Sequence, residues 1–170
     1  MKLYLAPLEG ITSYIYRKAL YQCFDGFDKY FIPFIRAKQN LNFSGREKKD
    51  ISLENNSGMY AVPQILSRNA DDFLRTANQL KEYGYQEVNL NLGCPSKTVV
   101  TKGCGAGFLT RPDELEQFLD RIFSKTDMKI SVKTRLGMED AEEFPRLMEI
   151  YNRFHGRTDH SSESTEGFLQ

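Results

Sequence analysis

The sequence predicts an α/β protein of the (β/α)8 TIM-barrel type, truncated to about five β/α units. Short apolar segments typical of buried strands recur roughly every 30–40 residues, and helical segments alternate with them. Such alternation favours right-handed crossovers and a parallel sheet. Several of the strands end in polar or charged residues, as they do in barrels whose site lies at the carboxyl ends of the strands.

Five apolar segments are the predicted strands. The first is closed by proline and glycine, and the second contains Pro33, which marks its end or a bend. The fourth and fifth carry polar residues at alternate positions, so those side chains share one face of the sheet. The predicted strands span residues 3–10, 29–35, 60–66, 87–92 and 129–136.

Helical periodicity marks the segments between the strands. Thr12 or Ser13 is a suitable cap for the first helix, and Asn69 or Asp71 for the second. Pro112 stands in the first turn of the third helix, a position that proline favours. The last helix, over 140–154, is expected to bury Phe144, Leu147, Met148 and Tyr151. Residues 36–58 are polar and are expected to form a loop with at most one helical turn.

Residues 1–154 are predicted to form a partial barrel, and residues 155–170 a disordered tail. The tail is polar, rich in Ser, Thr and Glu, and without periodicity, which is typical of disordered segments. A complete barrel typically needs about 250 residues, more than the 170 residues of this chain. An incomplete barrel exposes a strand edge, which favours self-association.

Composition and charge argue against several classes of protein. The chain is 40% hydrophobic, enough for one core, and its formal net charge is zero. Nucleic-acid binders usually show a basic excess, which this chain lacks. Binding through a local basic groove is the alternative that its zero net charge still allows. Three cysteines without CxxC spacing and two histidines predict no metal site. No apolar stretch reaches about 18 residues, which predicts no membrane span.

The cysteine count and the amino terminus favour a cytoplasmic protein. The number of cysteines is odd, and the opening apolar run is too short for the hydrophobic region of a signal peptide. Unpaired thiols of this kind fit a reducing compartment. We therefore expect a cytoplasmic location.

Cys94 is the leading candidate for chemistry. It follows a buried strand, in a Gly-Cys-Pro turn that leads into the glycine-rich segment 103–107. A thiol at the mouth of a strand can act as a nucleophile or a proton donor, whereas a buried structural cysteine is the alternative. The glycine pattern is only a weak signal for phosphate, and Lys97 and Lys102 are better placed to touch a polyanion at the rim.

Polar residues inside the third and fourth strands are further candidates. Gln64 is flanked by apolar residues and needs hydrogen-bond partners, because an unsatisfied buried amide costs roughly 1–3 kcal/mol. A ligand edge, neighbouring backbone or water would satisfy it. Asn89 and Asn91 face the same side of their strand. They form either an internal polar ladder or, at Asn91, a contact to a substrate with amide-like edges.

Two cations share one face of the fifth strand. Lys133 and Arg135 are two residues apart, and burying an unpaired cation is very costly. They therefore need an anion or an electron-rich ring system as a partner. An ion-pair cluster with Glu9 is the structural alternative.

Together these motifs resemble the tRNA-dihydrouridine synthases, which are flavin enzymes with an FMN-binding (β/α)8 barrel. The resemblance covers about residues 1–154, the N-terminal part of the barrel only. It rests on segments that follow the family's order and spacing: 6–10, 62–65, 90–106 and 132–137. The segment around Cys94 is the most specific of them.

The resemblance implies reduction of uridine to 5,6-dihydrouridine in tRNA, with FMN as cofactor and NADPH as reductant. Cys94 would protonate C5 of the uracil after reduced FMN delivers hydride to C6. The resemblance implies that Pro7, Leu8 and Glu9 line the flavin through their backbone, that Gln64 and Lys133 contact the isoalloxazine ring, and that Asn91 and Arg135 hold the target uracil.

The chain also departs from the family pattern. The family's phosphate-binding loops follow the last two barrel strands, and a helical RNA-binding domain normally follows the barrel; neither is visible in this sequence. His155-Gly-Arg-Thr158 resembles a motif at the end of the family's sixth strand, but no apolar strand precedes it, so it receives no role here. Two alternatives stay open: an inactive truncated fragment that needs a partner, and another FMN-barrel pyrimidine oxidoreductase.

Overall fold

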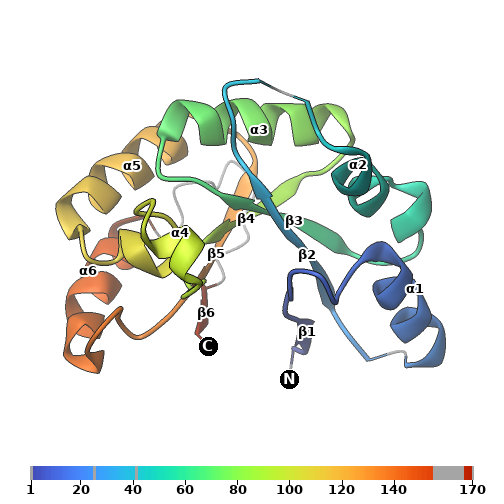
Figure 1. The fold of residues 1–170 in the computed structure, drawn as a ribbon, viewed down its shortest axis with the longest axis horizontal. Helices are drawn as coiled ribbons and strands as arrows, with labels where there is room; N and C mark the ends of the chain where they lie inside the picture. The colour runs from blue at the N-terminus through green and yellow to red at the C-terminus, as the bar shows by residue number, and fades with distance from the viewer. Residues whose placement is uncertain (1, 25, 41, 155–166, 170) are drawn as a thin grey trace.

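The fold is built on one parallel sheet. The computed structural model describes residues 2–24, 26–40, 42–154 and 167–169. All neighbouring strands are parallel, in the order β1-β2-β3-β4-β5-β6. The strands are β1 (Tyr4–Leu5), β2 (Lys29–Arg36), β3 (Ala61–Leu66), β4 (Glu87–Asn91), β5 (Lys129–Thr134) and β6 (Gly167–Leu169). The sheet curls into a half-barrel with β1 and β6 at its open side (Figure 1).

Helices form an outer arc around the sheet (Figure 1). They are α1 (Tyr14–Cys23), α2 (Gly45–Ile51), α3 (Ala70–Glu82), α5 (Pro112–Lys125) and α6 (Phe144–Phe154); the short helix α4 (Lys97–Val100), which follows β4, lies inside this arc. Asn69 caps α3 by accepting a hydrogen bond from the backbone N–H of Asp72 at 3.0 Å, and Pro112 opens α5, both as predicted.

Helix α2 lies where the sequence predicted a loop. It begins with a capping box, in which Ser44 Oγ accepts from the backbone N–H of Glu47 at 3.2 Å. The Glu47 carboxylate accepts in return from the backbone N–H of Ser44 at 2.7 Å. These reciprocal bonds satisfy the first turn and stabilise a short helix within a polar segment.

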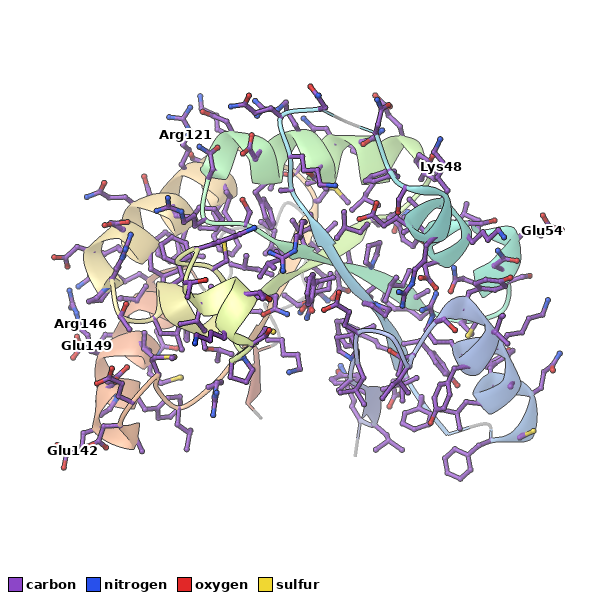
Figure 2. All side chains as sticks on the ribbon, in the orientation of Figure 1. Lys48, Glu54, Arg121, Glu142, Arg146 and Glu149 are labelled. Carbon is purple, nitrogen blue, oxygen red and sulfur yellow. The ribbon has the colours of Figure 1, made fainter. Side chains whose placement is uncertain are left out.

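A single apolar core fills the space between the sheet and the outer helices. Residues of β2, β3, β4 and β5 enter it, such as Val88 and Leu90 on β4, while Asn89 and Asn91 face the barrel interior. The edge of one phenylalanine ring meets the face of another at the α3–α5 contact, where the Phe73 and Phe118 centroids are 5.8 Å apart. Figure 2 shows labelled charged side chains of the helical layer, such as Arg121, pointing away from the sheet.

The barrel interior has a charged cluster at the amino ends of the strands. Lys29 Nζ lies 3.1 Å from Glu87 Oε2, and the Tyr60 hydroxyl donates to the same oxygen at 3.0 Å. The Lys29 ammonium also lies 5.5 Å from the centroid of the Tyr4 ring. Both charged side chains are nearly buried, so each supplies the partner that the other needs.

The predicted fold class is confirmed by this arrangement. The first strand is shorter than predicted: it ends at Leu5, and the following residues lead into a turn closed by the bond from the Ile11 N–H to the Leu8 carbonyl. Residues 155–166 and Gln170, most of the predicted tail, lie outside the described residues, and so does His155. Gly167–Leu169 of that tail instead form β6, which pairs with β5. Three residues are too few for periodicity to reveal a strand.

Two findings bear on membranes and metals. Within the described ranges, no helix has both the length and the apolar character needed to cross a membrane. Those same ranges contain no group of three or more His, Cys, Asp or Glu side chains placed to hold a metal ion.

Candidate functional site

The candidate site lies in the barrel interior, at the carboxyl ends of β3, β4 and β5. The register places Gln64 of β3 beside Asn89 of β4, and Asn91 of β4 beside Lys133 of β5. Because the strands are parallel, the residues that follow them meet at the same edge of the sheet. The predicted site residues on these strands are therefore neighbours in space.

The Cys94 turn is held from two sides. Asn91 Oδ1 accepts from the backbone N–H groups of Gly93 at 3.2 Å and Cys94 at 3.0 Å. On the other side, the Cys94 carbonyl accepts from the backbone N–H of Ala106 at 3.0 Å. The thiol is free and half-buried. This geometry presents one thiol from a rigid turn.

The glycine-rich segment supports the Cys94 turn directly. Gly105 has φ +56°, and a Cβ at this position would lie 2.7 Å from the Cys94 carbonyl oxygen. A side chain here would collide with that backbone, and the left-handed conformation also favours glycine. Close packing against the cysteine turn thus explains Gly105, whereas a Cβ at Gly107 would lie 2.7 Å from the Val100 carbonyl oxygen.

Four buried polar side chains form a relay across β3, β4 and β5. Asn91 Nδ2 donates to Gln64 Oε1 at 2.7 Å. Gln64 Nε2 donates to Asn89 Oδ1 at 2.7 Å. Asn89 Nδ2 donates to Ser131 Oγ at 3.0 Å. The polar ladder considered for the two asparagines is therefore present, and it includes Gln64 and Ser131 as well.

Lys133 and Arg135 are half-buried beside the thiol. Burial lowers the pKa of the Lys133 ammonium group, and the neighbouring charge of Arg135 lowers it further. The Cys94 sulfur acts in the opposite direction. Gly93 packs against the end of β5, since a Cβ there would lie 3.5 Å from Arg135 Cγ. The two cations and the thiol thus share one electrostatic environment.

The loop after β1 stands apart from this group in the sheet order. β2 and β3 separate it from β4 (Figure 1). The backbone N–H of Leu8 donates to Thr12 Oγ1 at 2.9 Å, and the Leu8 carbonyl accepts from the backbone N–H of Thr12 at 3.0 Å. The Leu8 backbone is thus used within the loop, whereas its side chain is 51% exposed. Pro7 is half-buried, and no ion pair of the exposed Glu9 occurs in the described part of the chain.

Sequence reasoning placed Lys102 at the rim but missed two further cations there, Arg36 and Arg68. Burial raises the pKa of the Cys104 thiol, and three cations that act in the opposite direction lie near it: Arg68, Arg36 and Lys102. Arg36 ends β2 and Arg68 follows β3 by two residues. Their position just after buried strands was the available signal, because such residues lie at the same edge as Cys94.

A comparison with known families now decides the assignment. A family model described as dihydrouridine synthase (Dus) matches residues 4–157, which include every residue of the candidate site. The chain belongs to the dihydrouridine synthase family. The resemblance recognised in the sequence is confirmed at this level.

Curated relatives of this dihydrouridine synthase family member agree with the match. The chain is 31% identical over 147 residues to a tRNA-dihydrouridine(16) synthase of Cupriavidus necator, covering 82% of this chain and 45% of that protein. It is 26% identical over 138 residues to tRNA-dihydrouridine synthase B of Pasteurella multocida, covering 81% and 41%. A probable tRNA-dihydrouridine synthase of Staphylococcus aureus strain COL is 29% identical over 144 residues. The chain therefore spans less than half the length of these relatives.

Proposed function

We propose that this chain carries the uridine-reducing site of a tRNA-dihydrouridine synthase, with FMN as cofactor and NADPH as reductant. The observation that carries the proposal is the Cys94 turn, which presents a half-buried thiol beside Lys133 and Arg135. Reduction of a uracil C5–C6 double bond needs a hydride at one carbon and a proton at the other. A positioned thiol is a suitable source of the proton. We place this activity in the cytoplasm.

The residues present fit the ring of a flavin. When bound and reduced by NADPH, FMN would be the source of the hydride for C6 of the uracil. Lys133 would lie against the electron-rich edge of the isoalloxazine ring, which offsets the cost of its burial. Each carboxamide nitrogen carries two hydrogens, of which the relay uses one, so Gln64 retains a donor for the ring. Residues 7–9 would cover the ring from the β1 loop, Leu8 through its exposed side chain.

Cys94 would donate the proton. Asn91 and Arg135 would hold the uracil, the first through its second amide hydrogen and the second through its guanidinium. The Cys94 S–H bond breaks as the C5–H bond forms, and the thiolate is reprotonated from solvent. The adjacent cations stabilise that thiolate. The target base must leave the RNA stack to reach the mouth of the half-barrel.

The cation group around Cys104 supports a polyanionic substrate. Arg36, Arg68 and Lys102 come from three different segments and meet at the carboxyl edge of the sheet. Arginine and lysine side chains supply most phosphate contacts in nucleic-acid complexes. This rim would position the RNA backbone while the target base enters the interior.

Reduction of a tRNA transcript tests the proposal. The purified chain is incubated with saturating FMN, NADPH and an unmodified transcript, and dihydrouridine is measured by mass spectrometry of the nucleosides. Cys94→Ser should lower the rate by about 10²–10⁴-fold. Cys23→Ser is the matched control, because that thiol is exposed at the end of α1 and should not matter.

Two outcomes would contradict the proposal. Equal product from the Cys94→Ser chain would remove the thiol from the chemistry. Reduction of free uracil in preference to tRNA would instead favour the alternative, another FMN-barrel pyrimidine oxidoreductase.

A second candidate is a chain that acts only in association with another. β1 and β6 are the outer strands of the described sheet, and strands in that position readily pair with further strands. Sedimentation analysis tests self-association directly. A monomer at all concentrations, active on tRNA, would count against this candidate.

A further inference from the structure

We propose that Asn89 and Ser131 are positioning residues for the Cys94 thiol, acting through Gln64 and Asn91. The inference deepens the proposed function, because it concerns the thiol assigned there as the acid. It rests, however, on hydrogen bonds within the chain, and its readout needs neither flavin nor tRNA.

The direction of the relay is imposed by the Cys94 turn. Backbone N–H groups of Gly93 and Cys94 can only donate, so Asn91 must turn its Oδ1 toward them. Its Nδ2 then points to Gln64, which must present Oε1.

The same constraint passes on to the next strands. With Oε1 facing Asn91, Gln64 turns Nε2 to Asn89 Oδ1, and Asn89 turns Nδ2 to Ser131 Oγ. A hydroxyl can accept or donate, so the serine end adapts to either direction. One orientation of all three amides therefore follows from the backbone of the cysteine turn.

The relay is almost closed to solvent, so water has little access to its hydrogen bonds. The exposed fractions are 1% for Gln64, 0% for Asn89, 5% for Asn91 and 0% for Ser131. A buried group that loses its partner carries its full desolvation cost. Loss of Ser131 Oγ would therefore leave Asn89 Nδ2 unpaired and weaken the orientation of each amide up to Asn91.

Only one of the two supports of the cysteine turn runs through this relay. The bond from the Ala106 N–H to the Cys94 carbonyl is independent of it. A weakened relay should therefore loosen the turn on the Asn91 side while the chain stays folded. The expected result is a thiol with altered exposure and acidity, which a purely structural role of Ser131 would not produce.

Alkylation of Cys94 by iodoacetamide tests this inference. Cys23 and Cys104 are first replaced by serine, so that the rate reports Cys94 alone, and the rate constant is followed against pH. Ser131→Ala should change the rate constant by about three- to tenfold, the size of one hydrogen bond, and shift the midpoint of its pH profile. Ser131→Thr keeps the hydroxyl and should restore both.

Thr76→Val is the matched control. Thr76 is also a buried residue, and the substitution removes a hydroxyl whose bond goes to the Asp72 carbonyl in α3, outside the relay. Urea unfolding should show a similar loss of stability for the two variants, whereas alkylation should change only with Ser131→Ala.

Asn89→Ser, which shortens the relay at its middle, is the second variant if Ser131→Ala does not fold. Unchanged alkylation kinetics in a folded variant would overturn the proposal. Unfolding of both variants would overturn it as well, because the relay would then serve stability rather than the thiol. Failure of the chain to reduce tRNA would refute the proposed function alone.

Discussion

The two ends of the barrel interior surround a cation in different ways: Lys29 is buried, whereas Lys133 is half-buried. At the amino end, Lys29 faces the Glu87 carboxylate at 3.1 Å and lies against aromatic rings. At the carboxyl end, burial lowers the pKa of Lys133, and the charges that act on this pKa include those of Cys94 and of a second cation, Arg135. The first arrangement is balanced by a carboxylate within the chain. The second would be improved by an electron-rich ligand.

This difference indicates that the cation at the amino end serves stability, whereas the cation at the carboxyl end serves the site. A cation that is paired inside the protein contributes to the fold and needs no ligand as a partner. A cation that is kept desolvated beside a thiol makes the ligand-free chain less stable than a chain without that cation. Such a loss of stability is a common feature of binding and catalytic sites. Substitutions at the two ends should therefore change stability in opposite directions.

The largest effect is expected at the amino end. Lys29→Met leaves the Glu87 carboxylate buried without its cation, which should lower the free energy of unfolding by about 3–5 kcal/mol. Urea unfolding measures the loss. The double variant Lys29→Met/Glu87→Gln should recover most of it, because no buried charge then lacks a partner. No recovery would mean that packing, rather than charge, dominates at this end.

The next effect concerns the support of the thiol. Gly105→Ala places a Cβ 2.7 Å from the Cys94 carbonyl oxygen, in a left-handed conformation, and should cost about 1–3 kcal/mol. Urea unfolding gives the cost. Gly45→Ala is the control: it begins helix α2, has nothing within 4 Å of the added Cβ, and should be neutral or slightly stabilising. Equal losses in both variants would refute this role of Gly105.

A smaller effect of opposite sign is expected at the carboxyl end. Lys133→Met removes the cost of burying the ammonium group and should raise the melting temperature by about 1–4 °C, while weakening FMN binding. Because the pKa of Lys133 is lowered in the folded chain, the unfolded chain binds this proton more tightly than the folded chain does. The folded chain therefore gains stability as pH rises from the lowered pKa toward 10.5. The substitution should remove that gain.

Calorimetry across this pH range, with flavin titration beside it, is the measurement. Lys125 is exposed, so Lys125→Met is the control and should leave the melting temperature and FMN binding unchanged. A loss of stability in Lys133→Met would contradict the contrast drawn between the two ends.

The smallest effect near neutral pH is expected from two tyrosines that lie outside the barrel interior, in or against the apolar core. Burial raises the pKa of Tyr85, which donates to the Ile51 carbonyl, and that of Tyr151, beside Thr134, to about 12 each. Their contribution to stability is complete below pH 10, the ordinary value, and is lost as pH rises through 12.

Tyr85→Phe should therefore make the loss of stability at alkaline pH smaller. At neutral pH the missing hydrogen bond should lower the free energy of unfolding by about 1 kcal/mol. Urea unfolding over this pH range measures both. Tyr151→Phe should behave alike, and an unchanged alkaline profile in both variants would refute the assignment.

Local signals in the sequence were enough for the elements and for the thiol. Short apolar segments located the first five strands, and Asn69 and Pro112 located two helix starts, because these signals lie within a few residues of the elements they mark. The Gly-Cys-Pro turn placed Cys94 at the mouth of β4. Helix α6 was found as well, but Ile150 and Phe154 are buried there, whereas Phe144 and Met148 are only partly so.

The sequence by itself thus determined the family, the barrel-type alternation and the identity of the candidate residues. Tertiary structure decided how they are used: that Asn91 holds the cysteine turn, that Gln64 joins Asn89, and that Arg36 and Arg68 approach Cys104. The physical reason is distance along the chain. Element boundaries depend on neighbours in sequence, whereas the relay and the cation group depend on strand register, which packing of the whole sheet sets.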